Sequence, residues 1–215
     1  SGRNRLDLQT LEFTRYRHDP KDTHSLGEDL VRAIYEDASG TLWVGTPNGL
    51  DELDAQRQAF VHYTNDPHDP DTLSLDDISA LYEDSSGILW IGTSVGGLNK
   101  LDKKTRRFIH FNNDPDDPAS LGDNTIWALL EDSHGALWAG GSGATNSLDR
   151  LDRQAGTLTH YQNNPLDANS LPPLAVLAIY EDSAGVLWVG TYEGGLHSLN
   201  LQSTSPPDGK FTHYR

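Results

Sequence analysis

The stretch Tyr35-Glu-Asp-Ala-Ser-Gly-Thr-Leu-Trp-Val-Gly-Thr46 recurs three more times along this 215-residue chain. Its counterparts begin at Tyr82, Leu130 and Tyr180 and keep the pattern Glu-Asp-X-X-Gly-X-Leu-Trp-X-Gly. The four tryptophans of this pattern are separated by 47, 48 and 50 residues. A fixed period of roughly 20–50 residues is typical of solenoids and propellers, so the repeat dominates the fold prediction.

Each repeat divides into four short segments with strand character. In the first repeat these segments cover residues 30–35, 42–44, 50–53 and 60–63. Turns rich in Gly, Asp and Asn separate them, because Gly supplies positive φ and Asp accepts bonds from its own backbone. No window shows the 3.6-residue period of an amphipathic helix. The chain is therefore predicted to be all-β.

Four antiparallel strands in about 48 residues are the pattern of one β-propeller blade. A blade cannot bury both of its faces alone, so neighbouring blades must pack together. We expect residues 1–215 to form a single propeller domain or a propeller fragment. A β-helix or an open sandwich is the competing fold, and the sequence leaves open whether four blades close. The expected four-stranded blades cover approximately residues 28–64, 76–112, 124–162 and 174–215, and residues 11–16 predict one surplus outer strand.

The composition excludes some classes of partner. With 16 basic and 32 acidic residues the net charge is -16, so there is no basic surface for nucleic acid. The longest apolar run, residues 174–180, is far shorter than the ~18–20 residues of a membrane-spanning helix. Five Trp, eight Tyr and five Phe still provide enough large side chains for a core.

The chain contains neither Cys nor Met and begins with Ser1. Without Cys there is no disulfide, no thiolate metal ligand and no cysteine nucleophile. We expect the chain to be processed or cut from a longer protein.

The repeats resemble the two-component regulator propeller family. The resemblance rests on the acidic turn with Gly, on Leu-Trp-Ile-Gly-Thr (residues 89–93) and on loops of the type Asp-Pro…Ser-Leu. The fourth loop departs from this pattern, with Asn164-Pro165 and Leu171-Pro172-Pro173. The other three loops read His18-Asp19-Pro20…Ser25-Leu26, Asn65-Asp66-Pro67…Ser74-Leu75 and Asn113-Asp114-Pro115…Ser120-Leu121.

The resemblance implies a non-enzymatic sensor. Members of the family commonly form the periplasmic part of hybrid two-component histidine kinases, in which seven-bladed propellers recognise polysaccharide breakdown products and signal through dimerisation. It therefore implies a periplasmic or extracellular chain with an oligosaccharide ligand and no cofactor. Two alternatives stay open: a protein-binding or self-associating scaffold, and a glycan-cleaving propeller enzyme.

Positions at which the repeats differ are the natural candidates for a ligand site. In a propeller, the connections between second and third strands share one face with the loops between blades. Trp127 is a further candidate, because its position holds Arg32, Ser79 and Leu177 in the other repeats. Unconstrained loop variation and core filling are the simpler explanations. The candidate ligand-binding residues are Asn48, Ser94, Trp127, Asn146, Tyr192 and Glu193.

Recurring residues receive structural interpretations. The four repeat tryptophans predict inter-blade core. The acidic loops could suggest calcium, but Asx turn chemistry explains them better. Adjacent Glu and Asp point to opposite faces of a strand and cannot flank one substrate bond. No catalytic residue and no metal site is predicted. Half-exposed outer-strand positions, too far apart to share a metal, are expected for His62, His110, His160 and His213.

Overall fold

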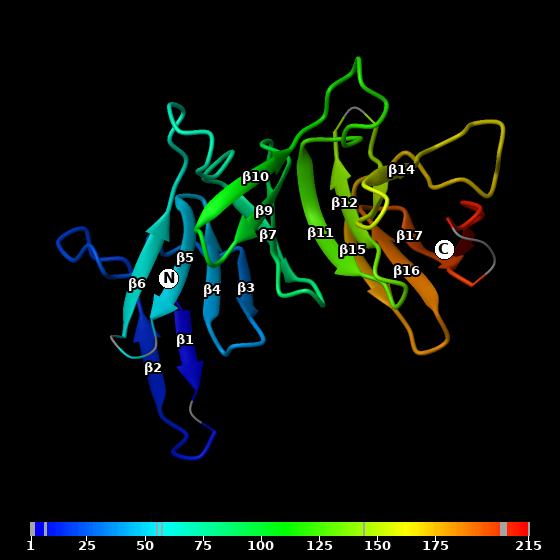
Figure 1. Cartoon of the computed structure of the whole chain (residues 1–215). Helices are drawn as coiled ribbons and strands as arrows, with labels where there is room; N and C mark the ends of the chain where they lie inside the picture. The colour runs from blue at the N-terminus through cyan, green and yellow to red at the C-terminus, as the bar shows by residue number, and fades with distance from the viewer. Residues whose placement is uncertain are drawn as a thin grey trace.

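The computed structural model describes residues 3–6, 8–54, 56, 58–143, 145–202 and 206–214. This part of the chain contains eighteen strands, which form four four-stranded antiparallel sheets and one two-stranded sheet (Figure 1). The predicted all-β fold with four propeller blades is confirmed. Among the described residues there is no helix that could cross a membrane.

Each blade is a meander in which the strands follow one another in chain order. The innermost strand comes first and the outermost strand last. Blade 1 contains β3 (Ala33–Glu36), β4 (Leu42–Thr46), β5 (Gly49–Asp54) and β6 (Ala59–Tyr63); blade 2 contains β7 (Ile78–Glu83), β8 (Leu89–Thr93), β9 (Leu98–Asp102) and β10 (Arg107–Phe111); blade 3 contains β11 (Thr125–Glu131), β12 (Leu137–Ser142), β13 (Leu148–Asp152) and β14 (Thr157–Tyr161); blade 4 contains β15 (Val176–Glu181), β16 (Val186–Thr191), β17 (Gly195–Asn200) and β18 (Thr212–Tyr214).

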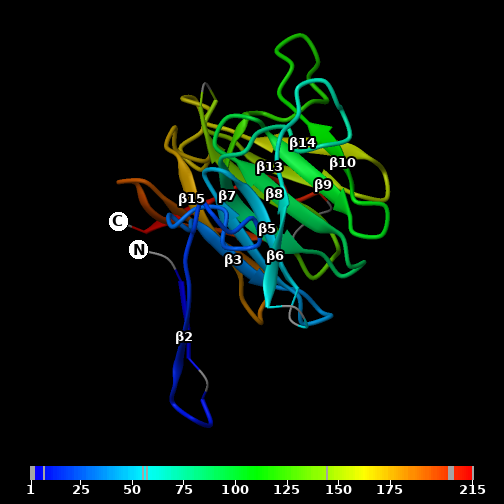
Figure 2. The ribbon, with the colours of Figure 1, turned by 90° about the vertical axis from the view of Figure 1, so that its left-hand side faces the viewer.

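The surplus strand of the sequence prediction is present as β2 (Phe13–Tyr16), but it does not stand alone. It pairs with β1 (Arg3–Leu6) in an antiparallel hairpin that projects from the blades (Figure 2). The first strand was not predicted, because only the aromatic outer strand of this repeat was identified in the sequence. Arg3–Leu6 corresponds by repeat position to β9 and pairs with β2 as β9 pairs with β10. The Tyr16 ring packs edge-on against Phe60 of blade 1, with centroids 5.6 Å apart. The hairpin therefore covers blade 1 where the outer strands of a preceding blade would lie.

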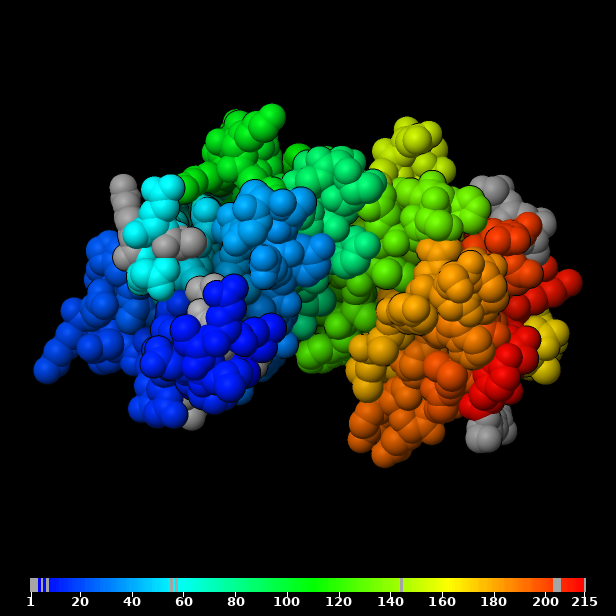
Figure 3. Space-filling view, turned by 90° about the horizontal axis from the view of Figure 1, so that it is seen from below, coloured from blue at the N-terminus to red at the C-terminus, as the bar shows by residue number. Residues whose placement is uncertain are grey.

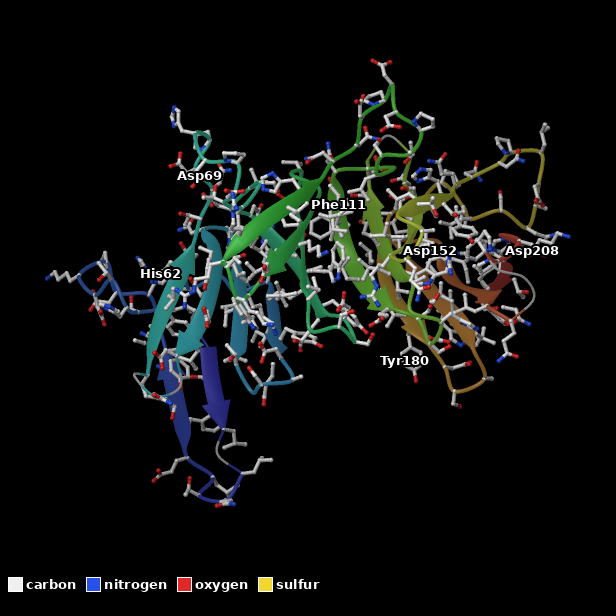
Figure 4. The ribbon with its side chains drawn as sticks, in the orientation of Figure 1. His62, Asp69, Phe111, Asp152, Tyr180 and Asp208 are labelled. Atoms are coloured by element: carbon white, nitrogen blue, oxygen red, sulfur yellow. The ribbon has the colours of Figure 1, made fainter. Side chains whose placement is uncertain are left out.

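A glycine in the second strand of each blade lets the next blade approach closely. A Cβ atom at Gly45 would lie 2.5 Å from Ile78, and one at Gly92 would lie 2.8 Å from Ile126. At Gly140 an added Cβ would likewise collide with Val176. Apolar layers follow between consecutive blades, and Figure 4 shows Phe111 between blades 2 and 3.

Three of the four repeat tryptophans are core residues, as predicted. Trp43, Trp90 and Trp138 are at most 2% exposed, whereas Trp188 is only half-buried. In every blade the indole Nε1 donates to the Asp of the acidic turn, at 2.7–3.0 Å. Burial alone would raise the pKa of Asp37, but hydrogen bonds from Ser39, Trp43 and Lys103 pull that pKa well below its usual value. The Asp of the turn thus serves as an ionised structural anchor.

In blades 2–4 the Glu next to this Asp bonds to the preceding blade. Glu83 accepts the backbone N–H of Ala38 at 2.7 Å, while Glu131 and Glu181 accept from the backbone N–H and hydroxyl of Ser85 and Ser133 at 2.5–2.7 Å. Two cations complete the junctions. Lys103 binds Asp37 and Glu83, and Arg153 binds Asp84 and Glu131.

The four blades form an open arc. Their inner strands pack in the order β3, β7, β11 and β15, and within the described part of the chain the strands of blade 1 do not pack on those of blade 4. Figure 3 shows a recess between the N-terminal hairpin in blue and the fourth blade in orange. Leu196 of blade 4 is 41% exposed, although the equivalent leucines of the other blades are almost fully buried. One face of blade 4 is therefore uncovered.

Candidate ligand pocket on the fourth blade

The loops that lead into blades 1–3 are fixed by a repeated set of bonds. Each loop begins with Asx turns, in which Asp19, Asp66 and Asp114 accept the backbone N–H two residues later at 2.9–3.0 Å. This confirms the predicted turn chemistry, and no metal-binding cluster occurs among the described residues. The Thr72 hydroxyl closes the second loop by donating to the Asp66 and Asp69 carbonyls. The Ser25 and Ser120 hydroxyls likewise donate to the Asp19 and Asp114 carbonyls. The equivalence of Ser74-Leu75 with Ser25-Leu26 was therefore wrong by two residues.

Outer-strand histidines hold the same loops from the side. The His160 Nδ1 lies 2.8 Å from Asp149, and its Nε2 lies 3.0 Å from the Pro118 carbonyl oxygen. The hydrogen bond to Asp149 raises the pKa of His160 above its usual value. His62 makes the same pair of contacts with Asp51 and the Thr23 carbonyl. These contacts with the loops were not predicted from the sequence, which indicated only half-exposed positions for the histidines.

Two backbone anchors complete loops 1–3. The inner carboxylate or amide of the third strand accepts a loop N–H: Asp51 from Gly27, Asn99 from Ser74 and Asp149 from Gly122. A second acceptor near the loop end binds the N–H at its start. The second pairs are Asp29 with His18, Asp76 with Asn65, and Asn124 with Asn113.

The fourth loop lacks the chemistry for both anchors. Pro172 occupies the position of Gly122 and has no N–H, while Leu174 occupies the position of Asn124 and has no side-chain acceptor. The third-strand position of Asp149 holds His197. In blade 4, therefore, Pro172 lacks the N–H donor of the first anchor, and His197 stands where the carboxylate acceptor of that anchor would be.

Buried His197 contacts half-buried His213. Their Nδ1 atoms lie 2.7 Å apart, and His197 is 1% exposed. The His213 Nε2 lies 3.0 Å from the Ala168 carbonyl oxygen, to which it can donate. The His197 Nε2 lies 3.1 Å from the Thr191 hydroxyl. The histidine pair thus connects β17, β18 and the fourth loop.

A pocket of about 750 Å³ opens at this altered loop, between residues 163–174 and the turn that starts β17. The loop is the yellow segment at the upper right of Figure 1. Three proline rings and Leu174 supply apolar wall. Amide, hydroxyl and carboxylate groups supply the rest, with His197 and His213 at the base of the loop.

The pocket has a negative rim. Asp167 and Glu193 line it, in a chain of net charge -16. Asp167 is engaged in its turn, because its Oδ1 accepts the Asn169 N–H at 2.9 Å. Glu193 is exposed and adopts φ +57°, and within the described residues no bond to its carboxylate is recorded. Glu193 is therefore available to a ligand.

One candidate from the sequence lines this pocket, and a second contacts a residue of its wall. Glu193 lines it, and the Asn146 Nδ2 of blade 3 lies 3.5 Å from the carbonyl oxygen of Pro173 in its wall. Asn146 has φ +46° and accepts the Gly143 N–H, which fixes its turn. Tyr192 is 57% exposed beside Glu193 but is not part of the pocket wall.

The other three candidates lie in different blades. The Asn48 Nδ2 donates to Glu28 at 3.2 Å within blade 1, and the Ser94 N–H donates to the Asp77 carbonyl within blade 2. Half-buried Trp127 donates from Nε1 to the Ser142 hydroxyl at 2.9 Å. The structure does not bring these residues to the pocket of blade 4.

A protein-family profile matches the same segment in each of the four repeats. The profile described as two component regulator propeller matches residues 25–48, 72–95, 120–143 and 170–193. The chain thus contains four segments that match the two-component regulator propeller repeat. Each match runs from the end of an interblade loop, through the acidic turn, to the end of the second strand.

Solved propellers with similar folds include sensor domains. The extracellular domain of a B. thetaiotaomicron protein described as a hybrid two-component system is 27% identical, with a TM-score of 0.73 over 86% of this chain and 24% of its own. The extracellular domain of a B. thetaiotaomicron one-component system is 22% identical, with a TM-score of 0.65 over 98% of this chain and 34% of its own. This chain thus spans about a quarter to a third of the length of these extracellular domains.

An enzyme shares the fold at lower identity. Virginiamycin B lyase from Staphylococcus aureus is 14% identical, with a TM-score of 0.69 over 99% of this chain and 62% of its own. At this identity the likeness shows the fold alone. The sequence has no match among curated proteins.

The presence of Pro172 and His197 in place of the usual donor and acceptor leads to a prediction about the stability of variants. Replacing His197 by Asp alone puts a carboxylate beside His213, as Asp149 lies beside His160, but opposite Pro172, which has no N–H to donate. The missing bond should destabilise the repeat propeller by about 1–3 kcal/mol. Adding Pro172→Gly restores the donor found at Gly122. The double variant should therefore show a coupling energy of about 0.5–3 kcal/mol in urea unfolding. Pro173→Gly with His197→Asp is the matched control, and equal coupling in both pairs would contradict the assignment.

Proposed function

We propose that this chain is the extracytoplasmic sensor segment of a two-component signalling protein and that its fourth-blade pocket binds a neutral oligosaccharide. The observation that carries the proposal is the coincidence of a pocket with the single loop that departs from the repeat. Three loops share their anchors, and the pocket lies where those anchors are replaced. The family match and the sensor-domain neighbours support the signalling context.

The wall chemistry favours a sugar. Sugar rings have apolar faces and hydroxyl edges, and the pocket offers proline rings beside amide and carboxylate acceptors. Sites of this kind combine an apolar surface with a few oriented polar groups. The carboxylates of Asp167 and Glu193 can accept from ligand hydroxyls but repel an acidic sugar. The ligand class is therefore neutral rather than uronic.

A non-enzymatic role is part of the proposal. Asp167 repeats the turn position of Asp22, Asp69 and Asp117, each of which accepts the backbone N–H two residues later. The turn therefore accounts for the Asp carboxylate at this position in all four loops. Glu193 is then the one pocket carboxylate without such a repeat counterpart, and a single free carboxylate does not make the acid–base pair of a glycosidase.

Thermal unfolding with short neutral gluco-, manno- and xylo-oligosaccharides tests the proposal, with oligogalacturonate as the acidic comparison. A ligand at a hundredfold excess over its Kd stabilises the folded state by ~2.7 kcal/mol, which raises Tm by several degrees. We expect one neutral sugar class to raise Tm and oligogalacturonate to have no effect.

Glu193→Ala should weaken binding of that sugar by about 10–100-fold, the loss of one charge-assisted hydrogen bond. Titration calorimetry measures the change. Asn48→Ala is the matched control, because Asn48 occupies the same repeat position in blade 1. A Glu193→Ala variant that binds like the original chain, or equal weakening by Asn48→Ala, would remove the pocket as the site.

A further inference from the structure

A second pocket lies at the junction between blades 2 and 3. Its volume is about 360 Å³, within the range of roughly 300–1,000 Å³ that is usual for small-molecule sites. Ile88, Trp90, Phe111 and Leu151 form its apolar wall, and Lys100 supplies an ammonium group. The remaining lining residues are Asp84, Ser86, Arg153 and Gly156. None of these residues lines the pocket on blade 4, so the two pockets are separate sites.

The neighbouring junctions fill the corresponding space with protein groups. Between blades 1 and 2, the Arg106 guanidinium lies 5.9 Å from the Tyr63 ring centroid and 3.8 Å from Glu52. The Tyr63 hydroxyl donates to the same Glu52 carboxylate at 2.5 Å. Between blades 3 and 4, the Tyr161 hydroxyl donates to the Pro207 carbonyl oxygen at 3.0 Å. In both junctions the tyrosine therefore has a covering group from the following blade or its own strand.

Two repeat differences leave this space open between blades 2 and 3. Phe111 stands at the position of Tyr63 and has no hydroxyl. Gly156 stands at the position of Arg106 and has no side chain. The backbone of the two turns is alike, with φ +68° at Gly156 and +59° at Arg106, and a Cβ added at Gly156 would have no atom within 4 Å. The pocket is thus the volume of a missing side chain and its partner.

The charge at this position is also reversed. Lys100 stands at the position of Glu52 and is half-buried, with its Nζ 5.9 Å from the Trp90 ring centroid. Among the ion pairs of the described residues, none involves Lys100. Glu52 has its cation in Arg106, whereas Gly156 brings no carboxylate to Lys100. The pocket therefore presents a positive charge beside an apolar wall.

The surrounding charges favour a ligand with a single negative charge. Arg153 is bound to Asp84 and Glu131, so these three groups together carry a net charge of -1, and Lys100 makes the cluster neutral. The cluster between blades 1 and 2 has three carboxylates and two cations, and thus a net charge of -1. Its members are Asp37, Glu52, Glu83, Lys103 and Arg106. One ligand carboxylate would give the pocket that same charge, whereas a dianion would add a second negative charge to a chain of net charge -16.

We propose that the pocket between blades 2 and 3 binds a small monocarboxylate that carries an apolar ring. The ligand carboxylate accepts from the Lys100 ammonium group and so takes the place of the missing protein partner. The ring lies against Phe111 and Leu151, in the space that the Arg106 side chain occupies in the preceding junction. The ligand contacts blades 2 and 3 together. This site and its ligand class are independent of the oligosaccharide proposed for blade 4.

Titration calorimetry of the full chain with phenylacetate and indole-3-acetate tests the proposal. We expect saturable one-to-one binding of at least one acid, and at least about tenfold weaker binding of its neutral amide, phenylacetamide or indole-3-acetamide. Lys100→Met removes the ammonium group and keeps an unbranched side chain. It should weaken the acid by at least about tenfold and leave the affinity for the amide unchanged, which a disturbed fold would not do. Lys104→Met is the matched control, because Lys104 is exposed in the turn after β9 and does not line the pocket.

Gly156→Gln tests the position of the ring. Gln58 occupies the same turn position in blade 1 with φ +53°, so glutamine is compatible with the backbone of this turn. The added side chain takes up pocket volume and should weaken the acid and the amide alike by at least about tenfold, while Tm without ligand stays within a few degrees.

Four results would overturn the proposal. They are the absence of binding by either acid, equal binding of acid and amide, an unchanged affinity in Lys100→Met, and an unchanged affinity in Gly156→Gln. Weakening of the acid by Glu193→Ala rather than by Lys100→Met would assign it to the pocket on blade 4, and this result also contradicts the proposal.

Discussion

Replacing Trp138 by Ala is expected to lower the free energy of unfolding by about 3–5 kcal/mol. Trp138 is fully buried between blades 3 and 4, and its ring lies 5.2 Å from that of Tyr161. Its Nε1 donates to Asp132 at 2.7 Å. The substitution leaves a cavity in the interblade core and takes one donor from a buried carboxylate. Urea unfolding at neutral pH measures the loss.

Trp188→Ala is the matched control, because Trp188 donates to Asp182 with the same geometry at 2.8 Å. Trp188 is only half-buried, on the uncovered face of blade 4. Its removal should cost clearly less than that of Trp138. Equal losses for the two variants would contradict the description of blade 4 as uncovered.

Replacing Arg153 by Leu should cost about 3–5 kcal/mol, the penalty for breaking a buried ion pair from one side. Arg153 joins blades 2 and 3 by binding Asp84 and Glu131, whose side chains are 1% and 7% exposed. Without the guanidinium, two carboxylates lie buried close to each other. Although burial raises the pKa of Asp84, hydrogen bonds from Trp90 and Ile88 and the Arg153 charge lower it below its usual value. Urea unfolding again measures the effect.

Arg106→Leu serves as the comparison for Arg153→Leu. The Arg106 side chain is 57% exposed, and its guanidinium lies 3.8 Å from Glu52. Exposed ion pairs of this kind contribute about 0–1 kcal/mol. A loss for Arg153→Leu as small as that for Arg106→Leu would show that the junction between blades 2 and 3 does not depend on its cation.

The fold could be predicted because the same residue pattern recurs in each blade. Trp43 and its counterparts, the acidic turn and Gly45 recur with a fixed period, so four independent copies of the pattern agree. The strand β1 was missed although the repeat contains it: Asn4, Leu6 and Phe13 align with Asn99, Leu101 and Phe108, and the pair Leu6–Phe13 repeats the pair Leu101–Phe108. The half-buried state of Trp188 could not be predicted, since its sequence context equals that of Trp138 and the two differ only in whether another described blade packs on them.

The pocket was only partly accessible from the sequence. Glu193 was a candidate because the turn residues differ between repeats, and the departure of Leu171-Pro172-Pro173 was visible. The link between Pro172 and His197 required the pairing of a loop N–H with a third-strand acceptor, as seen for Gly122 and Asp149. These residues lie 27 positions apart, and their contact follows from blade geometry rather than from spacing. His197 breaks the repeat column of Asp and Asn, and that break was the available signal.

The most direct test of the pocket is amide hydrogen exchange in residues 163–174, compared with residues 113–124 of the equivalent loop. Without ligand, the fourth loop should exchange faster, because it lacks the anchors that Asp149 and Asn124 give to the third loop. With a neutral oligosaccharide that raises Tm, protection should appear in residues 163–174 and 193–195. Equal exchange in the two loops, or protection at the turns of blades 1 and 2 instead, would contradict the assignment of the ligand site to blade 4.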